Sequence, residues 1–304
     1  MNKETANFRC GYVAIIGNPN VGKSTLMNGL LGQKISIVTN KPQTTRHKIL
    51  GILSSETYQM IFLDTPGLLK PKYLMHKEMM KSAQSAIADA DQVLYMIDAT
   101  HPNIGKEIEQ DVAFMTVKNL NKDVSLLINK TDLVTKVKTA EIIAFYSGQY
   151  QFKDVFPISA LTLDGTKVLL ETIASSLPEH QPFYPPDILS EHSERFFVSE
   201  IIREKIFEKF RDEIPYSTTV DIVEFKEAEG KKDVIRAEIY VERESQKGIL
   251  IGTQGKALKQ IGELARKDIE IFLDRPVFLE LFVKVREKWR DKKEWLNRLG
   301  YSSI

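Results

Sequence analysis

The octapeptide GNPNVGKS, Gly17–Ser24, is the segment whose residue types and spacing point most directly to chemistry. It fits the pattern GxxxxGK[ST], a loop whose backbone N–H groups hold phosphates when a strand precedes it and a helix follows. Gly17 and Gly22 would let the backbone curl around a phosphate. Lys23 would reach the β- and γ-phosphates, and Ser24 would bind Mg²⁺. The segment therefore predicts a nucleoside triphosphate site.

A second motif, DTPG at residues 64–67, follows an apolar stretch about 40 residues after the loop. Asp64 at the end of a strand would hold Mg²⁺ through water, and Gly67 would offer its N–H to the γ-phosphate. Alone, the same four residues would only predict a turn.

The motif NKTD at residues 129–132 indicates which base is bound. The carboxylate of Asp132 would accept both N1–H and N2–H₂ of guanine, whereas adenine would leave it buried and unpaired. Asn129 would tie this loop to the phosphate loop, and Lys130 would lie along the base. In the later sequence SAL, a backbone N–H of Ser159 or Ala160 would reach guanine O6.

The segment NKPQTTRHKIL lies between the first two motifs and has the residues of a nucleotide switch. Such a switch needs a hydroxyl that completes the Mg²⁺ coordination only when the γ-phosphate is present. We favour Thr45 for this role, with Thr44 as the alternative.

These motifs need strands that end beside one another. Apolar strands and helical patterns alternate over the first 177 residues, which predicts an α/β, mostly parallel sheet. Only two residues join 47–54 to 57–63, so this pair must form a hairpin and contribute one antiparallel strand. The other expected strands are 12–17, 93–98, 124–129 and 155–158, and the expected helices are 24–31, 77–89, 105–119 and 137–150.

Four prolines within 178–187 predict a boundary, after which the pattern changes to α+β. The expected order is α-β-β-α-α-β-α, with helices at 192–211, 245–251 and 255–273 and a last helix from about 287. Between the two middle helices lies a GxxG sequence, Gly252-Thr253-Gln254-Gly255. That is the loop by which KH domains clamp four nucleotides, and Lys256 and Lys259 would contact the chain. A plain helix-turn-helix is the alternative, but the element order matches the second KH topology.

Charge gives no further indication of a partner. The chain has 42 Lys and Arg against 41 Asp and Glu. Any RNA site must therefore be local. Seven basic residues between Lys284 and Arg298 could touch phosphates. A solvated face explains them equally well.

Together, GNPNVGKS, PQTTR, DTPG, NKTD and SAL resemble the translation-factor-related GTPases, and most closely the Era family, over nearly the whole chain. The resemblance implies a P-loop GTPase domain at 1–180, a Pro-rich linker at 181–190 and a smaller type II KH domain at 191–304. It implies that Mg²⁺ is held by Ser24, Thr45 and Asp64, and that Lys23, Thr45 and Gly67 act at the reacting phosphate. The implied phosphate-binding residues are Gly17, Asn18, Pro19, Asn20, Val21, Gly22, Lys23, Ser24 and Thr25; the base-binding residues are Asn129, Lys130 and Asp132.

Two positions bear on catalysis. Leu68 stands where Ras-type enzymes have a glutamine that orients water, so water must be positioned by backbone, another side chain or a partner. Asn20 matches an asparagine that holds K⁺ over the phosphates in some relatives; an amide that only stabilises the loop is the alternative reading.

The resemblance implies a GTP-hydrolysing switch, with GTP or GDP and Mg²⁺ as cofactors, that binds small-subunit ribosomal RNA near its 3′ end during subunit assembly. We expect a cytoplasmic monomer that binds no DNA, and a peripheral place at the inner face of the cell membrane stays open. One alternative is a metabolic P-loop kinase, which has no use for NKTD. The other is a GTP-binding scaffold with little turnover whose KH-like domain binds protein or membrane.

Overall fold

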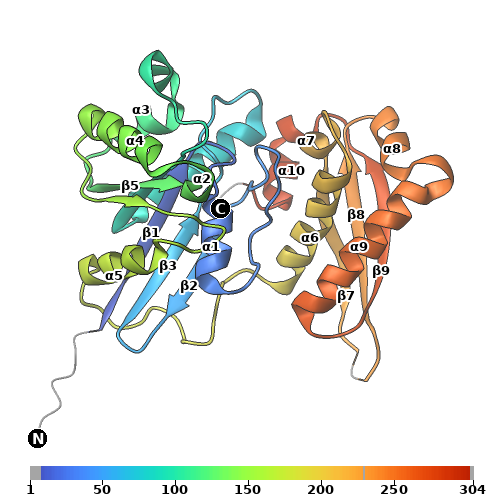
Figure 1. The fold of residues 1–304 in the computed structure, drawn as a ribbon. Coiled ribbons are helices and arrows are strands. Elements are labelled where there is room, and N and C mark those ends of the chain that lie inside the picture. The colour runs from blue at the N-terminus through green and yellow to red at the C-terminus, as the bar shows by residue number, and fades with distance from the viewer. Residues whose placement is uncertain (1–7, 229, 302–304) are drawn as a thin grey trace, which may run out of the picture. The chain divides into compact units, whose positions relative to one another are not determined.

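The computed structural model describes residues 8–228 and 230–301, which divide into two compact units (Figure 1). The first unit comprises the described residues up to Ser36, then Thr45–Lys72 and His76–Glu191. The second comprises Ile37–Thr44, Tyr73–Met75 and the described residues from His192 onward.

The first unit contains a sheet of six strands in the order β2-β3-β1-β4-β5-β6. All neighbours run parallel except β2, which is antiparallel to β3, as the short hairpin connection predicted. All six residues of β5 are buried, which is typical of a strand covered on both faces. The strands are β1 (Arg9–Gly17), β2 (Ile49–Ser54), β3 (Tyr58–Asp64), β4 (Gln92–Asp98), β5 (Val124–Asn129) and β6 (Val155–Pro157).

The register of this sheet brings the predicted motifs to one edge. Ile15 of β1 pairs with Asp64 of β3, and Asp98 of β4 pairs with Asn129 of β5. Because parallel strands end on the same side, the phosphate loop, DTPG and NKTD all emerge from the carboxyl edge.

The helices of this part of the chain largely follow the predicted ranges. They are α1 (Lys23–Leu31), α2 (Leu74–Asp89), α3 (Val112–Lys118), α4 (Lys136–Gln149) and α5 (Thr166–Ser176), with short 3₁₀ turns η1 (Gly105–Gln110) and η2 (Thr131–Leu133). The prediction of a single helix at 105–119 is wrong. Asp111 has extended backbone angles (φ −73°, ψ 106°) and its side chain caps α3, so the segment is split there into η1 and α3.

The predicted linker segment is hydrogen-bonded to a side chain of β3 in the first sheet. The side-chain oxygen of Gln59 in β3 accepts hydrogen bonds from the backbone N–H groups of Phe183 (2.9 Å) and Tyr184 (3.0 Å). Its side-chain nitrogen donates to the carbonyl of Tyr184 at 2.8 Å. Three bonds from one buried side chain thus fix the course of the proline-rich segment.

The second unit is an α+β fold with a sheet in the order β7-β8-β9. β7 and β8 are antiparallel, whereas β8 and β9 are parallel and joined by a helical crossover. The strands are β7 (Thr219–Lys226), β8 (Asp233–Val241) and β9 (Val277–Val285); the main helices are α6 (Glu194–Lys209), α8 (Glu244–Ile251) and α9 (Lys256–Leu273). The predicted order α-β-β-α-α-β is confirmed, with one additional short helix, α7 (Ile214–Ser217).

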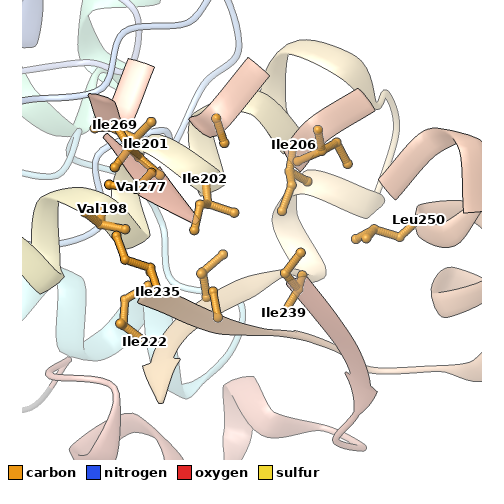
Figure 2. Packing of buried hydrophobic residues seen from close by; sticks show 14 of the residues in the cluster. Val198, Ile201, Ile202, Ile206, Ile222, Ile235, Ile239, Leu250, Ile269 and Val277 are labelled. Atoms are coloured by element: carbon orange, nitrogen blue, oxygen red, sulfur yellow. The ribbon is translucent and has the colours of Figure 1, made fainter. Parts of the chain in front are cut away.

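The core of the second unit is aliphatic. Inward residues of the strands, such as Ile235 and Ile239 of β8, pack against Ile202 of α6, Leu250 of α8 and Ile269 of α9 (Figure 2). The hydrophobic side of each amphipathic helix thus covers one face of the sheet, as the alternation of apolar and polar residues in the sequence requires.

The C-terminal segment differs from the single helix predicted from about residue 287. It forms a 3₁₀ turn, η4 (Trp289–Asp291), followed by α10 (Lys293–Arg298). Lys288 has a positive φ of 52°, and the buried Trp289 donates its indole N–H to the carbonyl of Ser217 at 2.8 Å. The left-handed residue and the buried indole together prevent a continuous helix.

Three of the seven basic residues between Lys284 and Arg298 have acidic partners within the second unit. Arg298 pairs with Asp221 at 2.8 Å, and the other two pairs are Lys284 with Glu238 and Arg290 with Glu242. These pairs favour the reading of the segment as a folded, solvated surface. Among the described residues, no helix combines the length and apolar character needed to cross a membrane.

Candidate functional site

The phosphate loop connects β1, which ends at Gly17, to α1, which begins at Lys23. Gly22 has a φ of 106°, and a Cβ atom there would lie 2.1 Å from the side-chain nitrogen of Asn129. Only glycine therefore fits at Gly22. The N-terminus of α1 emerges from this loop without a side-chain cap among the described residues, and such a helix end favours an anion.

Lys23 is buried beneath the loop with 6% of its surface exposed. Its Nζ donates to the carbonyl oxygens of Gly17 (3.2 Å) and Asn18 (2.9 Å). Burial lowers the pKa of Lys23 to about 8, although the charge of Asp64 opposes this shift. The ammonium group is thus held by the loop that would surround the phosphates.

Oxygen atoms from three segments gather next to this lysine. The hydroxyl of Ser24 donates to Asp64 Oδ2 at 2.7 Å and lies 2.9 Å from the hydroxyl of Thr45. Ser36 donates to the same carboxylate oxygen at 2.8 Å. Burial raises the pKa of Asp64, against the opposing effects of Lys23 and the two serine hydroxyls.

The other oxygen of Asp64, Oδ1, is buried and has no hydrogen-bond partner among the described residues. A buried carboxylate oxygen without a partner is costly unless a cation or water satisfies it. Carboxylate and hydroxyl oxygens are also the ligand types that Mg²⁺ prefers. The residues Ser24, Thr45 and Asp64 therefore fit a magnesium ion.

The two switch threonines differ in their contacts. Thr45 is the one whose hydroxyl lies beside Ser24. The hydroxyl of Thr44 instead donates to the carbonyl of Lys41 at 2.8 Å and lies at the same distance from the hydroxyl of Thr39. The geometry favours Thr45 over Thr44 as a metal ligand.

Gly67 and Leu68 lie against the start of the phosphate loop. A Cβ atom on Gly67 would be 2.8 Å from the backbone nitrogen of Pro19, so the close approach requires glycine. Leu68 donates its backbone N–H to the carbonyl of Gly17 at 3.2 Å and is 5% exposed. Its aliphatic side chain is packed and has no atom that could orient water.

The base-recognition loop is tied to the phosphate loop as predicted. The side-chain amide of Asn129 donates to the carbonyl of Val21 at 2.7 Å, and its oxygen accepts the backbone N–H of Ala160 at 2.8 Å. The backbone N–H of Ser159 is bonded to the carbonyl of Asp164 at 3.0 Å. If guanine O6 accepts the backbone N–H of Ala160, it would share that donor with the side-chain oxygen of Asn129.

Lys130 has a positive φ of 65° and forms an ion pair with Asp98 at 2.5 Å. Burial would raise the pKa of Asp98, but hydrogen bonds from Lys130 and Thr100 prevail and lower it. Asp132 lies exposed in η2, available to a ligand. Asp98 and Ser36 were not among the residues predicted from the sequence; for Asp98, its place at the end of a strand beside NKTD was the available signal.

The GxxG sequence forms the predicted tight turn between α8 and α9. Gly252 (φ 71°) and Gly255 (φ 75°) both have positive φ, and a Cβ on Gly252 would lie 2.7 Å from that of Ala257. Thr253 and Gln254 between them are exposed.

Positive charge and a groove adjoin this turn. Lys256 and Lys259, in the first turns of α9, are exposed, and no ion pair involves either within the described part of the chain. A groove runs from the turn between α9 and β9. Its lining includes Gly255, Lys259, Gly262, Arg266, Phe278 and Leu281.

Two family models match the chain. One, described as 50S ribosome-binding GTPase, matches residues 12–130, and the other, described as KH domain, matches residues 213–290. GTPase ERA1 of the chloroplast of Zea mays is 49% identical over 301 residues, which cover 97% of this chain and 71% of the relative. GTPase Era of Geotalea daltonii is 45% identical over 294 residues, 97% of this chain and 98% of the relative.

The chain belongs to the Era GTPase family. A crystal structure of Era in complex with MgGDPNP and nucleotides 1506–1542 of 16S ribosomal RNA matches with a TM-score of 0.91 and 40% identity, over 97% of this chain and all of the other. The predicted fold class, a P-loop GTPase domain followed by a KH domain, is confirmed. Like its Era relatives, the protein is a GTPase, so the metabolic-kinase alternative is wrong and the scaffold alternative is not favoured.

Proposed function

We propose that this Era-family GTPase binds small-subunit ribosomal RNA near its 3′ end and acts in assembly of the small ribosomal subunit. The observation that carries the proposal is the GxxG turn, in which two positive-φ glycines flank the exposed Thr253 and Gln254. Such a turn lets a sugar-phosphate chain approach the backbone closely. The Era relative with bound 16S rRNA matches 97% of this chain and supports the choice of RNA.

The surroundings of the turn suit single-stranded RNA. Lys256 and Lys259 would contact phosphates, because their charges are exposed and not engaged in ion pairs with described residues. The groove between α9 and β9 offers apolar and aromatic surface, including the half-exposed Phe278, on which bases would stack. One matching family model is described by the large subunit, but it covers the GTPase part alone. The relative with bound 16S rRNA matches both domains.

At the nucleotide site, we propose that the loop Gly17–Thr25 holds the phosphates and that Ser24, Thr45 and Asp64 hold Mg²⁺. The buried Oδ1 of Asp64, which has no hydrogen-bond partner among the described residues, supports this assignment. When bound, the ion would neutralise charge on the β- and γ-phosphates. Lys23 would add its positive charge, and Gly67 would donate its backbone N–H to the γ-phosphate.

For the base, we propose that Asp132 pairs with the guanine edge while Lys130 lies along the ring. The ion pair with Asp98 would keep the lysine extended in that position. Asn129 would connect base and phosphate recognition, and the Ala160 backbone would reach O6.

The buried Leu68 cannot orient the attacking water, so backbone groups, another side chain or the ribosomal partner must do so. K⁺ held through the exposed Asn20 is one such arrangement, and it stays a prediction. So do the domain limits 1–180, 181–190 and 191–304, the monomeric state, the cytoplasmic location and the peripheral contact with a membrane.

The proposal is tested by crosslinking the purified protein to total cellular RNA and sequencing the bound fragments. We expect fragments from the 3′ end of small-subunit rRNA to be enriched over the rest of that RNA. Enrichment of large-subunit rRNA, or of no rRNA segment, would contradict the proposal. A variant with Lys256 and Lys259 changed to glutamate serves as the control, because it should still bind GTP and yet lose the enrichment.

A further inference from the structure

Asp111 is a buried carboxylate outside every nucleotide motif in this sequence. It is 4% exposed and lies between η1 and α3. One of its oxygens, Oδ1, accepts the backbone N–H groups of Ala113 (2.9 Å) and Phe114 (3.0 Å) and so caps α3. These two hydrogen bonds explain why α3 starts here, but they involve only one of the two carboxylate oxygens.

The other oxygen, Oδ2, receives three side-chain donors. The amides of Asn18 (2.8 Å) and Asn103 (2.6 Å) donate to it, and the hydroxyl of Tyr95 lies 3.4 Å away. Burial raises the pKa of Tyr95, and the neighbouring charge of Asp111 raises it further, so Tyr95 stays a neutral donor. An ionised carboxylate suits this position because it only accepts hydrogen bonds.

One of these donors leads directly to the phosphate site. Asn18 is the second residue of the phosphate loop, and its backbone carbonyl accepts the Nζ of Lys23 at 2.9 Å. The side chain and the carbonyl of Asn18 therefore connect Asp111 with the lysine that would meet the β- and γ-phosphates. The chain of contacts is Asp111, Asn18, Lys23, all within the first unit.

We propose that Asp111 is a positioning residue for GTP binding and hydrolysis. It holds the Asn18 side chain, which fixes the peptide carbonyl that orients the ammonium of Lys23. Asp111 touches neither the nucleotide nor the reacting atoms. Two backbone N–H groups and three side-chain donors offset its negative charge, so the carboxylate is hydrogen-bonded and does not repel the phosphates as an unpaired charge would.

The first test is Asp111→Asn, which keeps the size and the capping oxygen but presents an N–H₂ group to three donors. Asparagine caps helices as well as aspartate does, so α3 and the fold should persist. Since a charge-assisted hydrogen bond is lost, we expect the affinity for GTP to fall about tenfold. The affinity for GMP, which lacks the β- and γ-phosphates, should change about twofold or less, because Lys23 does not contribute to it. Both are measured by competition against a fluorescent GDP analogue.

Asn18→Ala provides a second variant that does not touch the cap. It should show the same selective loss of GTP affinity, and the double variant with Asp111→Asn should be no worse than either single variant. Asn103→Ala is the matched control, because it removes a donor to the same oxygen but lies outside the phosphate loop. We expect its GTP affinity to stay within about twofold of the wild type.

Three results would overturn the proposal. These are an equal loss of GTP and GMP affinity in Asn18→Ala, additive effects in the double variant, and a loss in Asn103→Ala as large as that in Asn18→Ala. Each would mean that Asp111 acts only as a structural cap. If Asp111→Asn does not fold, the comparison of Asn18→Ala with Asn103→Ala decides alone.

Discussion

The side-chain amide of Asn129 donates a 2.7 Å hydrogen bond to the backbone carbonyl of Val21 and so joins the end of β5 to the phosphate loop. The two residues are 108 positions apart in the chain. Gly22 makes the contact possible, because any Cβ there would collide with the same amide. The loop proposed to recognise the base and the loop proposed to hold the phosphates are therefore directly hydrogen-bonded to each other.

Removal of this hydrogen bond should weaken the binding of all guanine nucleotides to a similar extent. Asn129→Ala leaves the Val21 carbonyl and the Ala160 N–H unpaired, and we expect affinities for GTP and GDP to fall by at least about tenfold. Fluorescent-nucleotide titration measures both. Asn119→Ala, at an exposed helix end in the same unit, is the matched control and should bind normally. Normal binding by Asn129→Ala would show that the two loops do not need this connection.

Base specificity should depend on Asp132. Asp132→Asn replaces an acceptor with an N–H₂ group, so GTP should bind at least about tenfold more weakly. Xanthosine triphosphate has a carbonyl where guanine has its amino group. It should bind more tightly to the variant than to the wild-type protein. The ratio of the two affinities is measured by competition. If Asp132→Asn retains the wild-type ratio, the base site lies elsewhere.

The magnesium requirement should change when the oxygen cluster is altered. Ser24→Ala removes one hydroxyl. Asp64→Asn removes the negative charge of the carboxylate, whose Oδ1 has no hydrogen-bond partner among the described residues. Both variants should need about tenfold more Mg²⁺ for half-maximal GTP hydrolysis. Ser175→Ala, at an exposed helix position, should show the wild-type requirement. An unchanged Mg²⁺ dependence in both site variants would reject these ligands.

Nucleotide affinity should depend on pH through Lys23, whose pKa burial lowers to about 8. Below that pH the lysine is charged before nucleotide binds. Above that pH Lys23 is neutral in the free protein and must take up a proton when the phosphates bind. The nucleotide affinity should therefore decline as pH rises through about 8 to 9. Lys23→Arg stays charged throughout and should lack this decline. The same pH profile in both proteins would contradict a titrating Lys23.

The nucleotide motifs were predictable because each is a short, local sequence at the end of a strand. Asp64 and Asn129 could be assigned from the apolar stretches that precede them, and the parallel sheet then brings them together. Asp111 was not predictable in the same way, since its partners Asn18 and Asn103 come from other loops. The split of the helix predicted at 105–119 had the same cause, because the Asp111 cap is a matter of side-chain geometry.

The second unit shows a similar division. The predicted element order included β7, β8 and β9, and the two glycines of GxxG predicted the turn between α8 and α9. A single C-terminal helix was predicted from about residue 287, but the burial of Trp289 against Ser217 is a tertiary contact with no local signal. Ion pairs such as Arg298 with Asp221 likewise depend on the folded sheet.

RNA binding at the GxxG turn is measured by electrophoretic shift with a single-stranded fragment from the 3′ end of small-subunit rRNA. The variant carries Thr253→Asp and Gln254→Asp, which place two negative charges where phosphates would lie. Its matched control carries Gln149→Asp and Gln151→Asp, at exposed positions of the first unit with the same change in net charge. We predict that the first variant loses at least about tenfold in RNA affinity, that the control keeps it, and that both bind GTP normally. Undiminished RNA binding by the folded first variant would contradict the account, because this turn would then be an ordinary connection between two helices.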